Sequence, residues 1–375
     1  MLEAKQKIFL IAIASLLVGV TSVQALLVTH IWDPSWNPYR PSPEQVLAQM
    51  VQKSKELNTF HLVQNFHATG KTSKGNFDFD FRFASDIDQS SLDALKAHSS
   101  FSIDLSSNAH LFTAQPTQTP SLILDHLALE GEVISIDGTS YVRLSSLSLP
   151  ESFETFFDLF YFGLDPNQLT NQWIKIDQKE LLAFSGISPE MAAQELQEQT
   201  QLQIELQEIL LSPQFYVIQQ ELPDEEVDGR KMHHYVLEIK VAEMIDAIFA
   251  KIFEQEDFQQ DQFAAEIAKG AIKGAVETFI EKIGPITSDM WIDKQTLYLH
   301  KATIEKTLDV KKIDQTLEGT SSFEYEMTYS DFNKSVAISA PAQSTSLQEL
   351  FETLLEPLIL QQYYEQSLFN PTLQQ

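Results

Sequence analysis

The chain has 375 residues, with 53 acidic against 25 basic side chains, a formal net charge of −28 and no cysteine. The lack of cysteine excludes disulfide frameworks, thiolate zinc sites, cysteine nucleophiles and thioether-linked lipid anchors. A hydrophobic fraction of 43 % is enough to build a folded core. The negative charge repels phosphate backbones and anionic headgroups, so we expect no nucleic-acid partner.

A charge-free, apolar run lies close to the N-terminus. It spans residues 8–32, follows Lys5 and Lys7, and as a helix is long enough to cross a hydrocarbon core of roughly 30 Å. Because the positive charges precede the run, we expect the rest of the chain to be exported. Two interpretations stay open: an uncleaved membrane anchor over residues 1–32, which we favour because the run continues past Ala25, and a signal peptide cleaved after Ala25.

A proline-rich stretch, DPSWNPYRPSP, follows the apolar run. Proline lacks the backbone donor that a helix needs, so residues 33–42 favour an extended stalk between the membrane and the body. The alternative is a loop held against the body by Trp36 and Tyr39.

The first half of the body combines one helix with a series of strands. Ser42, Pro43 and Gln45 form the cap and first turn of a helix expected over residues 43–57. Alternating apolar and polar residues then predict a hairpin whose strands span 60–69 and 76–83. Further strands are expected at 100–105, 129–136, 140–144 and 172–176, with the turn IDGTS between the second and third of these.

The second half combines helices with a second group of strands. A Gln-rich helix is expected over 191–211, then a hairpin at 215–222 and 231–240 with the acidic turn PDEEVDG. Amphipathic helices are expected at 241–253 and 263–283. The remaining elements are strands at 288–293, 296–306 and 320–332, with Lys294 and Gln295 as the first turn, a short pairing at 336–339, and a helix over 347–363 interrupted by Pro357.

The order of these elements predicts an α+β fold. Hairpins with helices placed between groups of strands are typical of a large antiparallel sheet with one face to cover. Because many strands carry aromatic and aliphatic residues at alternate positions, we expect the sheet to curve around the helices. Its concave side then receives further apolar groups.

Four segments also carry the pattern of a known family: PEQVLAQMVQKSKELNTFHLVQNFHATG, GRKMHHYVLEIKVAEMI, MWIDKQTLYLHKATIEKTL and FEYEMTYSDFNKSVAISAP. In this order they resemble the LolA-like/LppX-like superfamily of exported lipid and lipoprotein carriers, over residues 43–341. The resemblance implies an unclosed half-barrel wrapped around helices, with an apolar cavity that holds acyl chains. Many relatives carry a lipidated cysteine after the signal. Since this chain has none, a protein anchor would replace the lipid anchor.

The expected organisation therefore has four parts. Residues 1–32 are a signal anchor or signal peptide, and residues 33–42 are the stalk. Residues 43–341 form the LolA-like lipid-carrier-type domain, which includes the helical segment 241–283, and residues 342–375 form a C-terminal helix and tail.

Two aromatic groups and one tryptophan are the candidate ligand contacts. The first group alternates with charged residues along one strand and comprises Phe77, Phe79, Phe81 and Phe83. Such a stripe is either ordinary core, which we favour, or the wall of an acyl-chain cavity. The second group comprises Phe153, Phe156, Phe157 and Phe160. It lies in the segment 150–162, expected to be a core helix or a lipid-facing lid at the cavity mouth. Trp291 is expected to anchor the core and line the same cavity.

Patterns typical of metal sites are incomplete. His61 and His67 lie about 20 Å apart along one strand, and His233 and His234 point to opposite faces of another, so neither pair is expected to hold a metal. Asp86 begins a segment that imitates a calcium loop. However, serine and alanine stand where that loop needs its glycine and its bidentate glutamate.

Motifs for catalysis are absent from the sequence. It contains no nucleophile elbow, zinc-protease motif, phosphate-binding loop or dinucleotide fingerprint. We therefore expect no catalytic residue, no cofactor and no metal.

These observations favour an exported, membrane-tethered, non-enzymatic domain that binds a lipid or acyl chain in an apolar cavity between sheet and helices. The alternative is a structural or protein-interaction domain of the cell envelope, whose core is filled and whose surface is acidic. An enzyme is the third possibility, and it would need a pocket with converging polar groups. The sequence names neither the ligand nor a protein partner.

Overall fold

The computed structural model describes residues 41–90, 95–108, 125–150, 170–177, 212–253 and 262–354, and single positions between 188 and 210. The anchor or signal peptide expected over residues 1–32, most of the stalk and the aromatic group between 153 and 160 lie outside the described residues. Among the described residues, no helix is both long and apolar enough to span a membrane.

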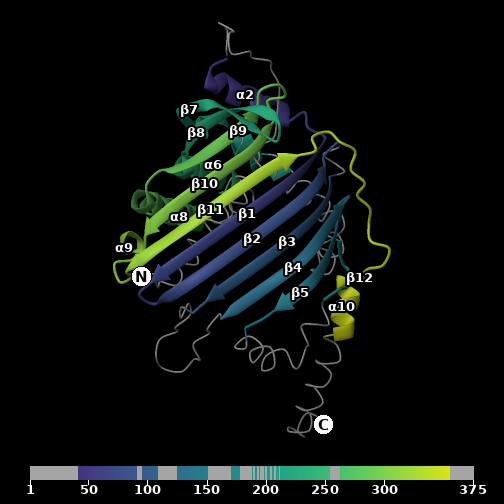
Figure 1. Cartoon of the computed structure of the whole chain (residues 1–375). Helices are drawn as coiled ribbons and strands as arrows, with labels where there is room; N and C mark the ends of the chain where they lie inside the picture. The colour runs from purple at the N-terminus through teal and green to yellow at the C-terminus, as the bar shows by residue number, and fades with distance from the viewer. Residues whose placement is uncertain are drawn as a thin grey trace.

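The described chain forms one sheet of twelve strands, in the order β12-β6-β5-β4-β3-β2-β1-β11-β10-β9-β8-β7 (Figure 1). The strands are β1 (Thr59–Thr72), β2 (Gly75–Asp88), β3 (Lys96–Ser107), β4 (His126–Ile136), β5 (Thr139–Ser148), β6 (Ile174–Asp177), β7 (Tyr216–Val227), β8 (Arg230–Ile239), β9 (Ile286–Asp293), β10 (Leu299–Asp309), β11 (Gly319–Ser330) and β12 (Thr345–Ser346). β7 and β12 form the two edges, so the sheet is unclosed. The expected α+β class and large open sheet are confirmed.

One edge of the sheet differs from the prediction. All neighbouring strands pair antiparallel except β12, which runs parallel to β6. The sheet is therefore mixed. The segment after β11 passes along the side of the sheet and reaches the β6 edge from the far end, which sets the direction of β12 (Figure 1). The pairing predicted at 336–339 is wrong, because these residues form no strand. The chain is instead held beside β1, where the Thr59 hydroxyl donates to the Lys334 carbonyl at 2.6 Å.

Two predicted hairpin turns form with the residue pairs that the sequence provides. Asp137 and Gly138 join β4 to β5 with φ angles of 50° and 80°, and Asp228 and Gly229 join β7 to β8 with φ angles of 51° and 75°. Positive φ at both positions is typical of the type I′ turn, which matches the twist of the flanking strands. The acidic residues before the second turn belong to β7 and not to the turn.

The connection between β9 and β10 is longer than the tight turn predicted at Lys294 and Gln295. β9 ends at Asp293, and β10 begins only at Leu299. In between, Leu297 adopts a φ of 52° and is fully buried. The Asp293 carboxylate holds this loop by accepting hydrogen bonds from two of its backbone N–H groups, both at 2.7 Å.

The first helix, α2 (Pro43–Ser54), starts as predicted. The Ser42 hydroxyl accepts a hydrogen bond from the backbone N–H of Gln45, and the Gln45 side chain accepts one from the backbone N–H of Ser42. This is a capping box. The other helices are η3 (Pro213–Phe215), α6 (Val241–Phe253), α8 (Gln262–Ile283), α9 (Val310–Ile313) and α10 (Leu347–Leu354). α6 and α8 confirm the two helices expected between the strand groups.

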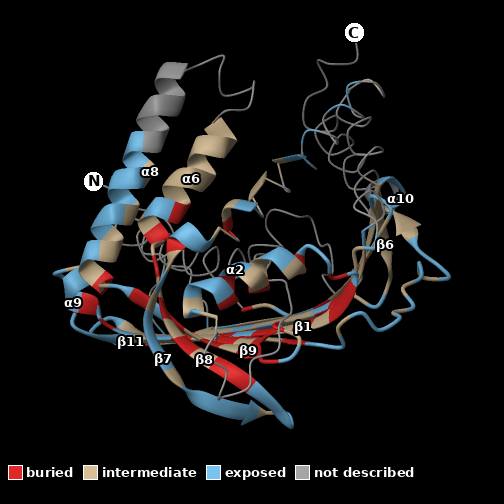
Figure 2. Ribbon diagram, turned by 90° about the horizontal axis from the view of Figure 1, so that it is seen from above, coloured by how far each residue is buried: buried red, intermediate tan, exposed pale blue. Residues whose placement is uncertain are grey.

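The sheet curves, and α2 lies on its concave side (Figure 2). At the end of the sheet formed by β7–β11, α6 and α8 stand next to each other, and Lys273 of α8 forms an ion pair with Asp246 of α6. At the opposite end of the strand order, α10 packs beside β6. We call the face that carries α2 the concave face and the opposite face the outer face.

The buried core occupies one half of the concave face. Its side chains come from α2, α6, β1 and β8–β11, together with the segments that connect them. The most completely covered apolar members include Met50, Leu237, Met290, Ile292 and Met327, whose exposed fractions lie between 0 % and 1 %. Within the described part of the chain, strands β2–β6 contribute no fully buried side chain to this core cluster.

Truncation in the core should distinguish the two faces of β11. Met327→Ala removes a side chain with an exposed fraction of 0 %. It should lower the free energy of unfolding by about 2–5 kcal/mol. Glu326→Ala, one position away on the outer face, removes only a partly exposed ion pair with Lys301. It should cost about 1 kcal/mol or less. Urea denaturation of both variants measures the difference, and equal losses would contradict this assignment of faces.

Candidate functional site

The concave face continues beyond the core across β3, β4 and β5. Directly paired antiparallel residues point to the same face, so the register extends the apolar surface from Phe81 through Ile103 to Leu129. The apolar side chains that these three strands place on it are Phe101, Ile103, Leu105, Leu127, Leu129, Val133, Val142, Leu144 and Leu147. We call this set the β3–β5 apolar face. All its members are partly exposed, and among the described residues none packs against the core cluster.

The phenylalanine stripe of β2 lies between the core and the β3–β5 apolar face. The members that pack against the core cluster are Phe79, Phe81 and Phe83. The Phe79 ring meets the Phe66 ring edge-on, with centroids 5.8 Å apart. Phe77 covers Gly70, where a Cβ would lie 2.0 Å from the phenylalanine ring. Three of the four rings therefore make core contacts, and the role of the stripe as a cavity wall stays a prediction.

A β-bulge interrupts the register between β4 and β5. The pairing shifts between Glu130 and Gly131, which leaves Ser145 as the extra residue of β5. A Cβ at Gly131 would lie 2.6 Å from the Arg143 carbonyl oxygen and 2.6 Å from the Phe101 ring. Only glycine therefore lets this ring lie so close to the sheet.

Trp291 lies on the outer face and not in the core, contrary to the prediction. Its neighbours Met290 and Ile292 are buried in the core, so the alternation of β9 points the indole the other way. There the ring stacks on His234 with centroids 4.3 Å apart, and its Nε1 donates to Glu225 at 2.7 Å. The sequence offers apolar residues at three consecutive positions here, so their hydrophobicity alone did not identify the buried face.

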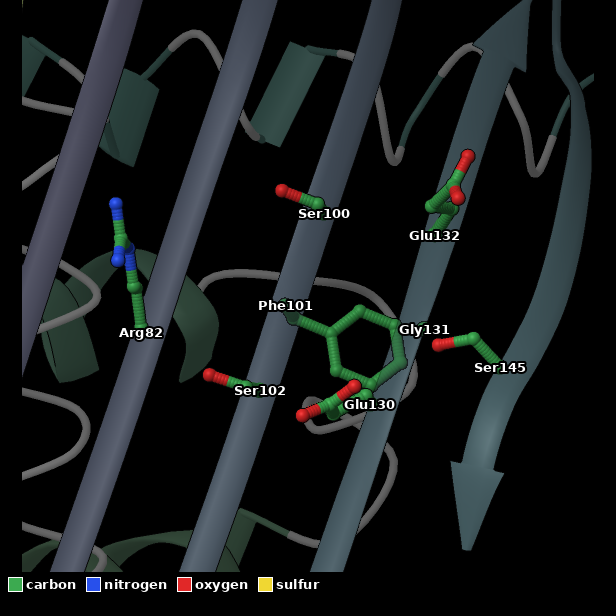
Figure 3. A pocket seen from close by; sticks show the side chains of 8 residues that line it. All are labelled: Arg82, Ser100, Phe101, Ser102, Glu130, Gly131, Glu132 and Ser145. Atoms are coloured by element: carbon green, nitrogen blue, oxygen red, sulfur yellow. The ribbon is translucent and has the colours of Figure 1, made fainter.

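The outer face carries a shallow polar pocket of about 230 Å³ (Figure 3). The residues that line it come from β2–β5 and are Arg82, Ser100, Phe101, Ser102, Glu130, Gly131, Glu132 and Ser145. Arg143 donates to Glu132 at 2.5 Å, and His98 lies 3.3 Å from its other oxygen. Burial by itself raises the pKa of Glu132, but the hydrogen bonds from Arg143 and His98 outweigh it and hold the pKa below its usual value. An ionised, hydrogen-bonded glutamate is poorly suited to donate a proton at neutral pH.

The histidines lie in separate surroundings. His61 lies 2.8 Å from Asp86, and His67 lies 2.9 Å from Asp80, so the two histidines belong to different clusters of the outer face. His233 is buried with an exposed fraction of 1 %, whereas its neighbour His234 bonds to carboxylates of the outer face. Their placement on opposite faces is confirmed.

The segment that imitates a calcium loop has another structure. Asp86 and Asp88 lie within β2 and so do not belong to a loop. Asp88 accepts hydrogen bonds from the backbone N–H and the hydroxyl of Ser90, which holds the end of the strand.

A polar cluster around the buried Asp293 secures the loop between β9 and β10. Asp293, 3 % exposed, accepts a hydrogen bond from Arg230 at 3.2 Å, and His300 lies 3.8 Å from it. Burial raises the pKa of Asp293, but hydrogen bonds from the backbone of Thr296 and Gln295 and from Arg230 outweigh it and lower the pKa below its usual value. Burial lowers the pKa of His300, so its imidazole is neutral at pH 7. The cluster holds the loop in place.

No family model and no curated protein matches this chain. Among solved structures, the crystal structure of the Mycobacterium tuberculosis lipoprotein LppX is similar at 12 % identity, covering 80 % of this chain and 100 % of LppX, with a TM-score of 0.29. A DUF1329 family protein from Desulfovibrio piger is similar at 10 % identity, covering 79 % of this chain and 93 % of that protein, with a TM-score of 0.19. At TM-scores this low, the likeness transfers no property to this chain.

Acid should weaken the loop that Asp293 holds. Because the pKa of this group is lowered, its contribution to stability is present above the ordinary carboxyl pKa of about 3.9. That contribution is lost as the pH falls through the lower pKa of the folded state. Asp293→Asn should therefore melt at a lower temperature than the parent near neutral pH, and the difference should shrink in strong acid. Thermal unfolding followed by circular dichroism across this pH range measures it, and a difference independent of pH would contradict the role of the charge.

Proposed function

We propose that this chain is an exported, non-enzymatic domain that binds a hydrophobic ligand, a lipid or acyl chain, on the concave side of its sheet. The binding surface is the β3–β5 apolar face together with the stripe Phe77, Phe79, Phe81 and Phe83. The predicted cavity-mouth group is part of the proposal and comprises Phe153, Phe156, Phe157 and Phe160. Trp291 is excluded from it, because its indole lies on the outer face.

The observation that supports this proposal is the uneven burial of one continuous apolar face. Over β8–β11 most of the apolar side chains on the concave face are buried, whereas over β3–β5 all the apolar side chains on the same face are partly exposed. Apolar area left in water costs about 25 cal/mol per Å². A contiguous apolar surface of this kind marks a binding site more often than a row of scattered surface residues does.

The chemistry of the face favours an uncharged, apolar ligand. Among the described residues of β3–β5, the charged side chains, such as Asp104 and Glu132, share the outer face. On the concave face the hydroxyls of Ser85 and Ser99 bond to each other at 2.8 Å. An acyl chain on this surface would gain about 0.8 kcal/mol for each buried methylene before ordering costs. Selection would therefore depend on apolar length and volume.

The tether is the second part of the proposal. The apolar run at residues 8–32 would hold the domain on the outer side of a membrane, and the proline-rich residues 33–42 would space it from the lipid. A domain placed there is close to a source of acyl chains, so it could receive, hold or pass on a lipid without diffusing freely.

One observation favours a second candidate function. The packing of Phe79, Phe81 and Phe83 against the core cluster is what an ordinary filled core requires. A sheet filled by the chain's own side chains would make this a structural or protein-interaction domain of the cell envelope, with its acidic outer face as the contact surface.

Recovery of bound lipid distinguishes the two functions. Residues 42–375, which lack the apolar run, are purified without detergent, and their native mass is recorded before and after organic extraction. Stoichiometric lipid in the first spectrum is expected for the ligand-binding function. A clean apo mass, no uptake of a fluorescent fatty acid and no thermal shift on adding lipid would reject it and favour the interaction domain.

A matched pair of variants tests the position of the site. Leu105→Asp places a carboxylate on the β3–β5 apolar face, where burying it beside a ligand is unfavourable. Ser106→Asp adds the same charge at the next position on the outer face, opposite His126. Titration with a fluorescent fatty acid should show at least a tenfold loss of affinity for the first variant and less than a twofold change for the second. Equal affinities in two variants with parent-like circular dichroism would contradict this placement.

A further inference from the structure

The outer face carries a group of metal-ligating side chains on the β1–β2 pair. His67 of β1 and Asp78 and Asp80 of β2 each offer one ligand atom, and these atoms all lie within 4.8 Å of one another. The His67 Nδ1 is 2.9 Å from an oxygen of Asp80 and 3.7 Å from an oxygen of Asp78. We propose that these three residues bind a divalent transition-metal ion, with Zn²⁺ as the probe.

The strand register brings the three side chains together. Asp78 and Asp80 are two positions apart on one strand and therefore share a face. His67 is the direct partner of Asp80 in the antiparallel pairing of β1 with β2. That pairing runs without interruption along both strands, and β11 and β3 flank it on either side. The ligands are thus held by paired strands and not by a loop, which favours a preformed site.

The separations fit a metal with bonds of ordinary length. Zinc bonds to imidazole nitrogen and carboxylate oxygen are about 2.1 Å long, so neighbouring ligand atoms of a tetrahedral or octahedral ion lie about 3.0–3.4 Å apart. The distances from His67 to Asp80 and Asp78, 2.9 Å and 3.7 Å, fall on either side of that range. An imidazole ligand favours zinc and its neighbours over Ca²⁺ and Mg²⁺, which prefer sets composed of oxygen. The remaining coordination positions would be open to water.

A row of like charges crosses the sheet through this site. The register places Glu305 opposite Glu324, Glu324 opposite His67, and Asp80 opposite Asp104. Like charges that face each other on adjacent strands destabilise a sheet. Within the described residues, no lysine or arginine lies at ion-pair distance from any of these carboxylates. A divalent cation at His67 would offset this repulsion where the row meets the three ligands.

Calorimetric titration of the full chain with Zn²⁺, after removal of metal by a chelator, tests the proposal. We expect one Zn²⁺ per chain, and at least tenfold weaker binding of Ca²⁺ and Mg²⁺. His67→Ala and Asp78→Asn should each lower the zinc affinity at least tenfold. Cobalt offers a second readout, because replacing water by an imidazole ligand shifts and strengthens the visible absorption of Co²⁺, and His67→Ala should return the spectrum to that of the aqueous ion.

His61→Ala is the matched control. His61 lies on the same strand and face, with Asp86 at 2.8 Å and Asp331 close enough to interact electrostatically, but among the described residues it belongs to no group of three converging ligand atoms. The zinc affinity of the His61→Ala variant should stay within twofold of the parent value. Melting temperatures in chelator verify that all variants are folded. The proposal is overturned if the parent binds no stoichiometric zinc, or if His67→Ala and His61→Ala bind it equally well.

Discussion

The pairing of β1 with β11 is the constraint on which the rest of the structure depends. Strands β1–β6 lie side by side in chain order, as do β7–β11, and the two groups join where His61 to Thr72 pair with Ser330 to Gly319. At the end of this register a Cβ on Gly319 would lie 1.9 Å from the Lys71 carbonyl oxygen, so the two strands approach closely only because glycine is present. Contacts between residues so far apart along the chain close a long loop, which slows folding.

The same junction explains why the core is one-sided. It places β1 beside the β8–β11 group, and α2 then covers the concave face over these strands, where Leu62, Met290 and Met327 are almost fully buried. Strands β3–β5, on the other side of β1, carry the same apolar pattern, but among the described residues they are not part of that cluster. The asymmetry on which the ligand proposal depends is therefore a result of topology and not of composition.

Much of this fold follows from local pattern. The α+β class, the capping box of α2, the Asp-Gly turns and the alternation of β2 depend on residues a few positions apart, and local propensity determines them. The parallel pairing of β12 depends on the path of residues 331–344 along the side of the sheet, and no periodicity encodes that path. The face of Trp291 was missed for a related reason, since its neighbours on both sides are apolar.

The spacing of histidines along one strand does not identify the candidate metal ligands. The carboxylate partner of His67 lies on the next strand, and the position of the hairpin turn determines which residue of that strand faces His67. Once the turn is placed so that Thr72 pairs with Gly75, counting back along both strands brings His67 opposite Asp80. The distance between β1 and β2 along the chain is short, so this part of the candidate site was accessible to sequence reasoning. The β3–β5 apolar face can be identified only when the pairing registers of β2 with β3, β3 with β4 and β4 with β5 are all known.

The two proposed sites share β2 and occupy its opposite faces. Asp78 and Asp80 point outward, whereas Phe79 and Phe81 point to the concave side, so a ligand on one face does not touch a metal on the other. Any coupling between them must pass through the backbone of β2, whose position a metal bound across β1 and β2 would fix. Coupling of binding free energies is reciprocal. If zinc orders the phenylalanine stripe and so raises the affinity for an acyl chain, the acyl chain must raise the affinity for zinc by the same factor.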